Sequence, residues 1–263
     1  MSEHIRHAAV AGMFYPDQEL ELRQMVQGYL NQATPLDGPA PKAIIAPHAG
    51  YIYSGPVAAS AYINLLKVAK QIQRVVLLGP AHRVPVRGIA ASSAGNFATP
   101  LGLVPIDMEA VRMICEMPGV RIDDEAHMLE HSLEVHLPFL QVVLDKFTLV
   151  PLLVGRASAV DVDLVLSRLW NGPETLLVIS SDLSHYHDYK TARELDKATS
   201  EAIEKLDYEH INYENACGRD PVNGLLHFAK RFGLHAKTID LRNSGDTAGP
   251  HDKVVGYGAY LFH

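Results

Sequence analysis

The pattern that most constrains the fold of this chain is a regular alternation between short apolar runs and longer amphipathic segments. The short runs are rich in β-branched and aliphatic residues, and two of them, 75–78 and 176–179, are apolar at every position. Runs of this kind predict strands that are buried on both faces of a sheet. The predicted strands cover residues 43–46, 74–78, 149–154, 175–179, 237–241 and 254–261.

The longer segments carry apolar residues at spacings of three and four, which is typical of helices with one buried face. In the first of them, Leu22, Met25 and Val26 follow this spacing. The predicted helices cover residues 20–30, 57–68, 108–117, 133–144, 160–170, 192–206 and 221–232. Alternating strands and helices predict an α/β protein with a central, largely parallel or mixed β-sheet flanked by helices.

Length and composition indicate one globular domain. The chain has 263 residues, of which 48% are hydrophobic and 20% are charged, so it can bury a large core. Because no repeat and no break in composition divides the chain, we predict a single domain over residues 1–263. The formal net charge of −7 argues against nucleic acid as a partner, since binding to phosphates needs a basic surface.

Nothing in the sequence predicts association with a membrane. The first residues lack the basic start and apolar core of a secretory signal, and no apolar run approaches the roughly 20 residues of a membrane-spanning helix. The two cysteines, Cys115 and Cys217, are too few for a disulfide framework or a cysteine-rich zinc site. We expect a cytoplasmic protein with reduced thiols, with Cys115 in the core and no sequence neighbour that activates Cys217.

Three histidines and a carboxylate follow predicted strands. His48, His82 and His185 each come shortly after one of these strands, and Asp246 follows another. In open α/β sheets, ligands bind outside the carboxyl ends of the strands. Two histidines and a carboxylate are the ligand set of non-haem Fe(II) sites, and zinc can use the same ligands to activate a water molecule. The pattern therefore predicts a divalent-metal site at one edge of the sheet.

Five motifs in this chain resemble the Memo family, and together they span nearly its whole length. They are APHAGYIYSG at 46–55, LGPAH at 78–82, EHSLEVHLPF at 130–139, SSDLSH at 180–185 and NSGD at 243–246. In prokaryotes this family is the B component of the AmmeMemoRadiSam system. The resemblance implies the single-domain fold of the class III extradiol ring-cleaving dioxygenases, with a metal site at one end of the sheet.

The resemblance also implies roles for individual residues. His48 and His82 would be metal ligands, with Fe(II) as the expected metal and zinc or copper as alternatives. His185, with Asp182 nearby, stands where those dioxygenases keep their acid–base histidine. If the protein is an enzyme, the metal would bind substrate and dioxygen together, and His185, held by Asp182, would move a proton.

The third metal ligand is where this chain departs from the family pattern. Animal members carry a cysteine in the loop before the last strand and the dioxygenases carry a glutamate, but residues 242–252 contain neither. We predict Asp246 as this ligand, because an ionised carboxylate binds Fe(II) or Zn²⁺ far better than a hydroxyl group does. A gap-free alignment to animal members would place Thr247 there instead.

Other residues are expected to line the pocket or to support the ligands. Metal-bound histidines usually hydrogen-bond through their second ring nitrogen to a carboxylate or a carbonyl group. The residues expected in these roles are Phe14, Tyr53, Glu130, His131, Glu134, His136, Ser244 and Thr247.

Two other functions compete with the dioxygenase hypothesis. His127, Glu130 and His131 match H-x-x-E-H, the inverted zinc-peptidase motif, although so short a motif arises easily in a chain with 14 histidines. The pocket could also be a non-catalytic site for a metal, a peptide or a phosphopeptide, working with a radical-enzyme partner. The sequence does not identify the ligand, which is an unknown small molecule or peptide. It also leaves open whether the protein is an enzyme.

Overall fold

A large mixed sheet forms the centre of the molecule. The computed structural model describes residues 4–263. Within this part of the chain, the strands of the large sheet are β2 (Ala43–Ala46), β3 (Arg74–Pro80), β4 (Ile89–Ala91), β7 (Val120–Ile122), β8 (Thr148–Val154), β9 (Thr175–Ser180), β10 (His185–His187), β11 (Ala236–Asn243) and β12 (Val254–Phe262). A smaller sheet contains β1 (Ile5–Arg6), β5 (Asn96–Thr99) and β6 (Gly102–Pro105).

The strand order of the large sheet is β10-β12-β2-β9-β3-β8-β4-β7, with β11 paired to the outer side of β12. β2, β9, β3 and β8 run parallel to one another. β12 runs antiparallel to both β2 and β11, and β4 runs antiparallel to β8. The predicted α/β class and mixed sheet are therefore confirmed.

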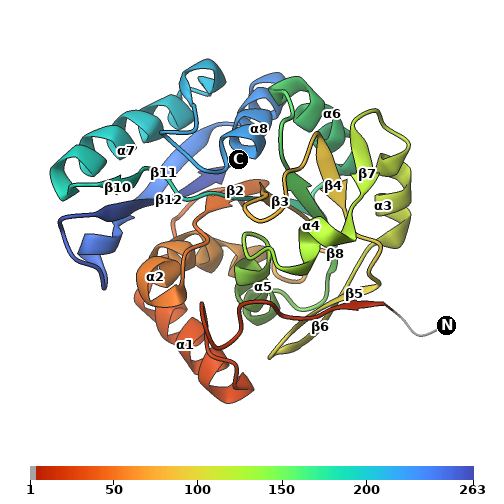
Figure 1. Cartoon of the computed structure of the whole chain (residues 1–263), viewed down its shortest axis with the longest axis horizontal. Helices are drawn as coiled ribbons and strands as arrows, with labels where there is room; N and C mark the ends of the chain where they lie inside the picture. The colour runs from red at the N-terminus through yellow and green to blue at the C-terminus, as the bar shows by residue number, and fades with distance from the viewer. Residues whose placement is uncertain (1–3) are drawn as a thin grey trace.

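Helices cover both faces of the large sheet (Figure 1). One face carries α1 (Glu19–Gln32), α2 (Tyr51–Tyr62) and α5 (Leu137–Val143), and the other carries α6 (Ala159–Leu169), α7 (Tyr189–Glu204) and α8 (Arg219–Phe232). The short helices α3 (Met108–Cys115) and α4 (Asp124–Met128) lie near the edge formed by β4 and β7. None of the described helices is long and apolar enough to cross a membrane.

The six predicted strands correspond to β2, β3, β8, β9, β11 and β12. The predicted helices are also present, although two of them differ in their limits. The helix expected over 57–68 begins at Tyr51 and continues as the 3₁₀ helix η1 (Ile63–Val68), and the one expected over 133–144 divides into η2 (Glu134–His136) and α5. The strands that the pattern misses include β4, β7 and β10, which have three residues each, too few to show an alternation.

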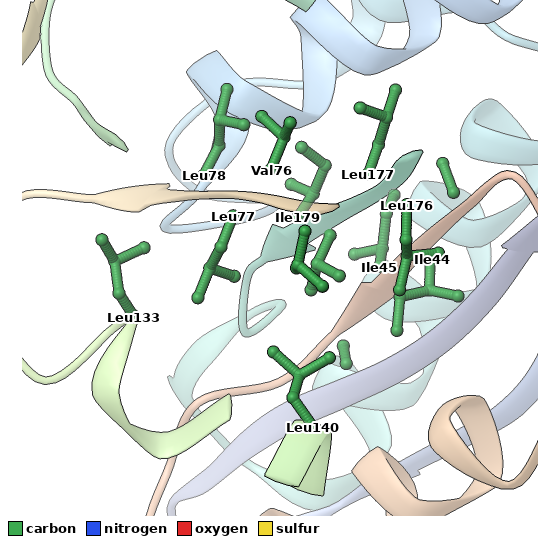
Figure 2. Packing of buried hydrophobic residues seen from close by; sticks show 14 of the residues in the cluster. Ile44, Ile45, Val76, Leu77, Leu78, Leu133, Leu140, Leu176, Leu177 and Ile179 are labelled. Carbon is green, nitrogen blue, oxygen red and sulfur yellow. The ribbon is translucent and has the colours of Figure 1, made fainter. Parts of the chain in front are cut away.

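The central strands are buried on both faces, as their uniformly apolar sequences predict. Figure 2 shows Val76 and Leu78 projecting to one face of β3 and Leu77 to the other, as the pleat of a strand requires. On the side of Leu77, Leu133 and Leu140 point toward the sheet from the segment that contains α5. Full burial of each such side chain stabilises the folded state by roughly 1.5–3 kcal/mol. The strand ends, from which the loops begin, are therefore rigidly positioned.

Candidate metal centre

Three predicted residues meet at the edge where neighbouring parallel strands end. β2, β9 and β3 are adjacent and parallel. His48, Asp182 and His82 each stand two residues beyond the end of one of these strands. The strand order alone therefore brings these side chains to one place.

His131 joins His48 and His82 there, and these three histidines form the candidate metal centre. One ring nitrogen from each lies within 4.8 Å of the other two. The ring centroids of His82 and His131 are 4.8 Å apart, and those of His48 and His131 are 5.5 Å apart. Because imidazole nitrogens bind zinc and similar metals at about 2.1 Å, the three nitrogens would have to move closer together to share one ion.

Glu130 positions two of these histidines, His82 and His131, through hydrogen bonds to its carboxylate. Its carboxylate accepts a hydrogen bond from Nδ1 of His82 at 3.0 Å and from the main-chain N–H groups of His82, His131 and Ser132. Burial alone would raise the pKa of Glu130, but the hydrogen bonds and the charge of His82 lower it to about 2. The carboxylate is therefore ionised and leaves Nε2 of His82 free to bind a metal. Such support is typical of metal-bound histidines.

The hydrogen bonds of His48 fix which of its ring nitrogens is free. Ser180 donates its hydroxyl proton to the carbonyl oxygen of Ser132 at 2.6 Å, so its oxygen accepts from Nδ1 of His48, also at 2.6 Å. The lone pair of His48 is therefore on Nε2. Burial, reinforced by the neighbouring histidines, lowers the pKa of His48 well below its usual value, so the ring is neutral and able to bind a metal at neutral pH.

His131 has the features of a ligand rather than those of a supporting residue. Burial lowers its pKa to about 4, against the opposing charge of Glu130. Its Nδ1 is buried without a hydrogen-bond partner, although it lies 3.2 Å from an oxygen of Glu130. Because one of its ring nitrogens lies within 4.8 Å of nitrogens of His48 and His82, His131 could be a ligand in a metal site.

A glycine allows the segment with His131 to approach the end of β3. A Cβ atom at Gly79 would lie 2.9 Å from both the Ser132 hydroxyl oxygen and a methyl group of Leu133. With hydrogen in that place, the Ser132 hydroxyl donates to the carbonyl oxygen of Pro80 at 2.7 Å. This contact fixes His131 beside His82.

The candidate centre opens into a cavity of about 610 Å³. Its walls include His82, His131, His185, Tyr186 and Cys217. Nδ1 of His185 lies 2.8 Å from the carbonyl oxygen of Leu183. A carbonyl oxygen only accepts hydrogen bonds, so Nδ1 carries the proton and Nε2 is an acceptor. Nε2 is therefore the ring nitrogen of His185 that is not committed to Leu183.

Asp182 supports His48 rather than His185. One of its carboxylate oxygens accepts the main-chain N–H of His48 at 2.8 Å, and the other lies 3.9 Å from Nε2 of the same residue. Burial raises the pKa of this carboxyl group, and His185 opposes that effect. The expectation that Asp182 holds His185 directly is not what the structure shows, because the carbonyl group of Leu183 makes that contact.

The structure does not bring Asp246 to the histidines. Its strand, β11, is separated from β2 by β12, and each step between strands is about 4.8 Å. The carboxylate of Asp246 instead accepts from the Tyr189 hydroxyl at 2.5 Å and from the main-chain N–H of Asn243 at 2.9 Å. It faces a separate small cavity beside Arg193. In the described chain, the third member of the cluster that could hold a metal is His131, and Asp246 is not part of it.

The alternative residue Thr247 also lies in this loop. Its hydroxyl group donates to the carbonyl oxygen of Ser244 at 3.2 Å, and the Ser244 hydroxyl accepts from the main-chain N–H of Val255 at 3.1 Å. Both side chains therefore stabilise the turn η4 (Ser244–Asp246), and neither is among the residues that line the cavity beside His82 and His131.

Glu134 is fully buried, and it anchors the start of the chain rather than the cavity. Its carboxylate pairs with Arg6 and accepts from the Tyr15 hydroxyl and from the main-chain N–H groups of Ala9 and Val10. Arg6 also donates to the carbonyl oxygens of His127 and Glu130. The N-terminal segment is thereby fastened to the segment that carries His131.

The other predicted pocket residues lie at different distances from the centre. The ring of Phe14 packs against His131, with centroids 4.8 Å apart. Tyr53 is half exposed on the first turn of α2 and is not among the residues that line the cavity. His136 is buried away from the cavity, where its Nδ1 lies 2.8 Å from the Tyr62 hydroxyl.

The histidines of the zinc-peptidase motif do not converge. α4 ends at Met128, so His127 and His131 are not on one helix. Nε2 of His127 lies 3.0 Å from the carbonyl oxygen of Ala90, in the core. The motif therefore lacks the geometry that a zinc peptidase requires, because its two histidines must share a helix face.

His127 and His136 predict a loss of stability in mild acid. Burial lowers the pKa of His127 to about 4 and that of His136 to about 3. Below about pH 6.5 these two histidines are protonated in the unfolded chain but remain neutral in the folded chain. The free energy of unfolding therefore falls as the pH falls, by about 1.4 kcal/mol per pH unit for each histidine. Urea unfolding between pH 6.5 and 4 should show this slope, and a His136→Gln variant should show a shallower one. Equal slopes would contradict the prediction.

Fold and site together define an α/β protein with a three-histidine candidate metal centre at the strand ends. A sequence model of a known family, described as "Memo-like protein", matches residues 6–261. The chain belongs to the Memo family, and the resemblance seen in its five motifs is confirmed.

Curated relatives extend over the full length of this chain. A "MEMO1 family protein" of Aeropyrum pernix is 37% identical over 280 residues, covering 97% of this chain and 98% of the relative. A "MEMO1 family protein" of Aquifex aeolicus is 37% identical over 269 residues, covering 98% of this chain and 99% of the relative. Among solved structures, the uncharacterized protein JW3007 from Escherichia coli K12 has a TM-score of 0.53 and 14% identity, over 83% of this chain and 98% of that one. At this identity the likeness concerns the fold alone.

Sequence reasoning gave His131 only a supporting role and did not place Cys217 at the cavity. His131 was expected only to support the ligands, although its place directly after Glu130 in the EHS motif is a signal for a carboxylate–histidine pair. Cys217 was set aside, yet it lines the cavity. No neighbour of Cys217 in the sequence indicates this position, because it depends on how the loop before α8 packs.

Proposed function

We propose that His48, His82 and His131 hold a divalent metal, iron, and that the protein is an oxidoreductase of the extradiol-dioxygenase type. The observation that carries this proposal is the convergence of three imidazole side chains, two of which, His82 and His131, line a cavity of about 610 Å³. Three protein ligands leave coordination positions open. When bound, iron supplies the redox chemistry that joins dioxygen to an organic substrate.

The donor set fits a metal with little reorganisation. Burial keeps His48 and His131 neutral, so they need not lose a proton before binding. Glu130 supplies a negative charge directly behind His82, and this charge offsets part of the charge of a divalent cation. These features favour a resident metal over three histidines that merely pack together.

Side chains around the cavity supply the other functions that such a reaction needs. Nε2 of His185 can accept the proton of a substrate hydroxyl group, because Nδ1 is held by Leu183. The rings of Tyr186 and Tyr213 can pack against a flat substrate, and the guanidinium group of Arg83 can bind an acidic group on it. The proposed substrate is therefore a small hydroxylated aromatic molecule.

Iron loading and oxygen uptake test this proposal. Protein loaded with Fe(II) in the absence of oxygen should hold about one iron per chain, and a panel of catechols should include one that drives oxygen uptake. A His185→Gln variant should keep the iron and lose about 10²–10⁴-fold in rate, the usual contribution of a positioned acid–base group. If the wild-type protein takes up no Fe(II), zinc or copper at micromolar concentrations, the metal centre is refuted.

The second candidate is a non-catalytic binding site for an anionic peptide or phosphopeptide. The observation that favours it is Arg83, an exposed cation at the cavity wall, since arginine binds carboxylates and phosphates well. In this case the iron-loaded protein would consume no oxygen with any catechol, and an Arg83→Ala variant would lose affinity for phosphotyrosine peptides.

A further inference from the structure

Cys217 lies in contact with a proposed metal ligand. Its Sγ atom is 3.3 Å from Nε2 of His48, the ring nitrogen that carries the free lone pair. Cys217 also lines the same cavity as His82 and His131. The chain has one other cysteine, Cys115, which lies in α3.

The fold holds Cys217 at this point through the loop that precedes α8. The main-chain N–H of Gly218 donates to the Ser181 hydroxyl at 3.0 Å, and that of Cys217 lies 3.3 Å from the carbonyl oxygen of Asp182. A Cβ atom at residue 218 would lie 2.5 Å from the carbonyl oxygen of Ser180. Glycine is therefore required there for the loop to reach the end of β9, and the thiol reaches His48 as a result.

The distance between the two atoms suits a shared metal. Nε2 of His48 can accept the thiol S–H at 3.3 Å, and the carbonyl oxygen of Asp182 is a second, more distant acceptor at 3.7 Å. A metal at about 2.1 Å from an imidazole nitrogen and about 2.3 Å from a thiolate sulfur holds the two atoms about 3.6 Å apart at a tetrahedral angle. The sulfur is already within a few tenths of an ångström of that separation.

We propose that Cys217 is a thiolate ligand of the metal that the three histidines bind. The proposal rests on the proposed metal centre and adds a fourth donor to it. The metal–sulfur bond replaces the S–H bond, the thiol proton leaves to solvent, and no electron is transferred. A thiolate favours soft metals, including zinc and Cu(I), over hard ones such as Mg²⁺.

Cobalt reports this bond directly, without an activity measurement. The wild-type protein titrated with Co(II) should develop the near-ultraviolet absorption of a thiolate-to-cobalt charge transfer, saturating at about one metal per chain. A Cys217→Ser variant should lack this absorption and bind Co(II) and Zn²⁺ about 10–100-fold more weakly, the scale on which metal sites lose affinity when their supporting groups are removed. A Cys115→Ser variant should behave as the wild-type protein does.

A second measurement needs no variant at Cys217. Native protein treated with iodoacetamide should be modified at Cys217 more slowly when Zn²⁺ is present, while the rate at Cys115 stays the same, as read by peptide mass spectrometry. This experiment applies even if the Cys217→Ser chain does not fold.

The outcomes separate this proposal from the metal centre itself. If the wild-type protein binds one Co(II) without the thiolate absorption, or if Zn²⁺ leaves the alkylation of Cys217 unchanged, the histidine centre stands and the cysteine ligand is refuted. If the absorption persists in Cys217→Ser, it belongs to Cys115 and the proposal is equally refuted. If the wild-type protein binds no metal at all, both proposals fall.

Discussion

Replacing His131 by alanine is expected to lower the affinity for Zn²⁺ or Fe(II) by more than about 100-fold, the upper range seen when a ligand loses only its supporting partner. Replacing Asp246 by asparagine is expected to leave that affinity unchanged. The reason is geometric, since a nitrogen of His131 lies within 4.8 Å of those of His48 and His82. Asp246 instead contacts Tyr189 and Asn243.

Competition with a chromophoric chelator measures both affinities, and the metal content of the purified variants provides a second readout. Asp246→Asn is a matched control because it removes one carboxylate from the other candidate position. If Asp246→Asn loses the metal and His131→Ala keeps it, the loop before β12 rearranges when metal binds, and the carboxylate ligand predicted from the sequence is correct.

Replacing Glu134 by alanine is expected to lower the free energy of unfolding by about 3–5 kcal/mol, because breaking a buried ion pair leaves the charge of the other partner uncompensated. That partner is Arg6, and both side chains are buried. The variant also leaves the main-chain N–H groups of Ala9 and Val10 without their acceptor. Since folded domains are stable by only about 5–15 kcal/mol, the variant is close to unfolding at 37 °C.

Urea unfolding followed by circular dichroism measures this loss. A Glu201→Ala variant is the matched control, because Glu201 is exposed and such changes usually cost within about 0.5 kcal/mol. Glu134→Gln keeps the shape of the side chain and removes only its charge, so it should fall between the two. A loss below 1 kcal/mol for Glu134→Ala would mean that the N-terminal segment does not depend on this carboxylate.

The sequence was sufficient to predict β2, β3, β8, β9, β11 and β12 and the edge at which the histidines meet. Runs such as 75–78 are apolar throughout. Such a run indicates a buried strand whichever segments pack against it. The rule that ligands bind at strand carboxyl ends then selected His48, His82 and His185. The selection assumed only that the sheet is parallel in this region. The structure adds that β2, β9 and β3 are neighbours.

Strand order is the property that no local pattern contains. Asp246 follows β11 just as His48 follows β2, and the two strands run in the same direction. The insertion of β12 between them separates Asp246 from the histidines. An expectation based on strand ends alone cannot distinguish these two cases, because it treats every strand as equally near to the others.

The rule based on strand ends could not predict site residues that lie in other loops, for a different reason. His131 and Cys217 reach the site because Gly79 and Gly218 each leave space for a neighbouring segment. In the sequence, each of these glycines resembles any other turn glycine. Their role depends on atoms that are distant along the chain, so only the folded molecule reveals it.

The position of β12 has a consequence for how the protein is made. The last strand, Val254–Phe262, pairs with β2 inside the sheet, and β2 pairs on its other side with β9, about half the chain away. A ribosome releases the chain from its N-terminus, so β2 waits first for β9 and then still longer for β12 before both of its edges are paired. We therefore expect the strand that leads to His48 to reach its final position only after β12 has emerged.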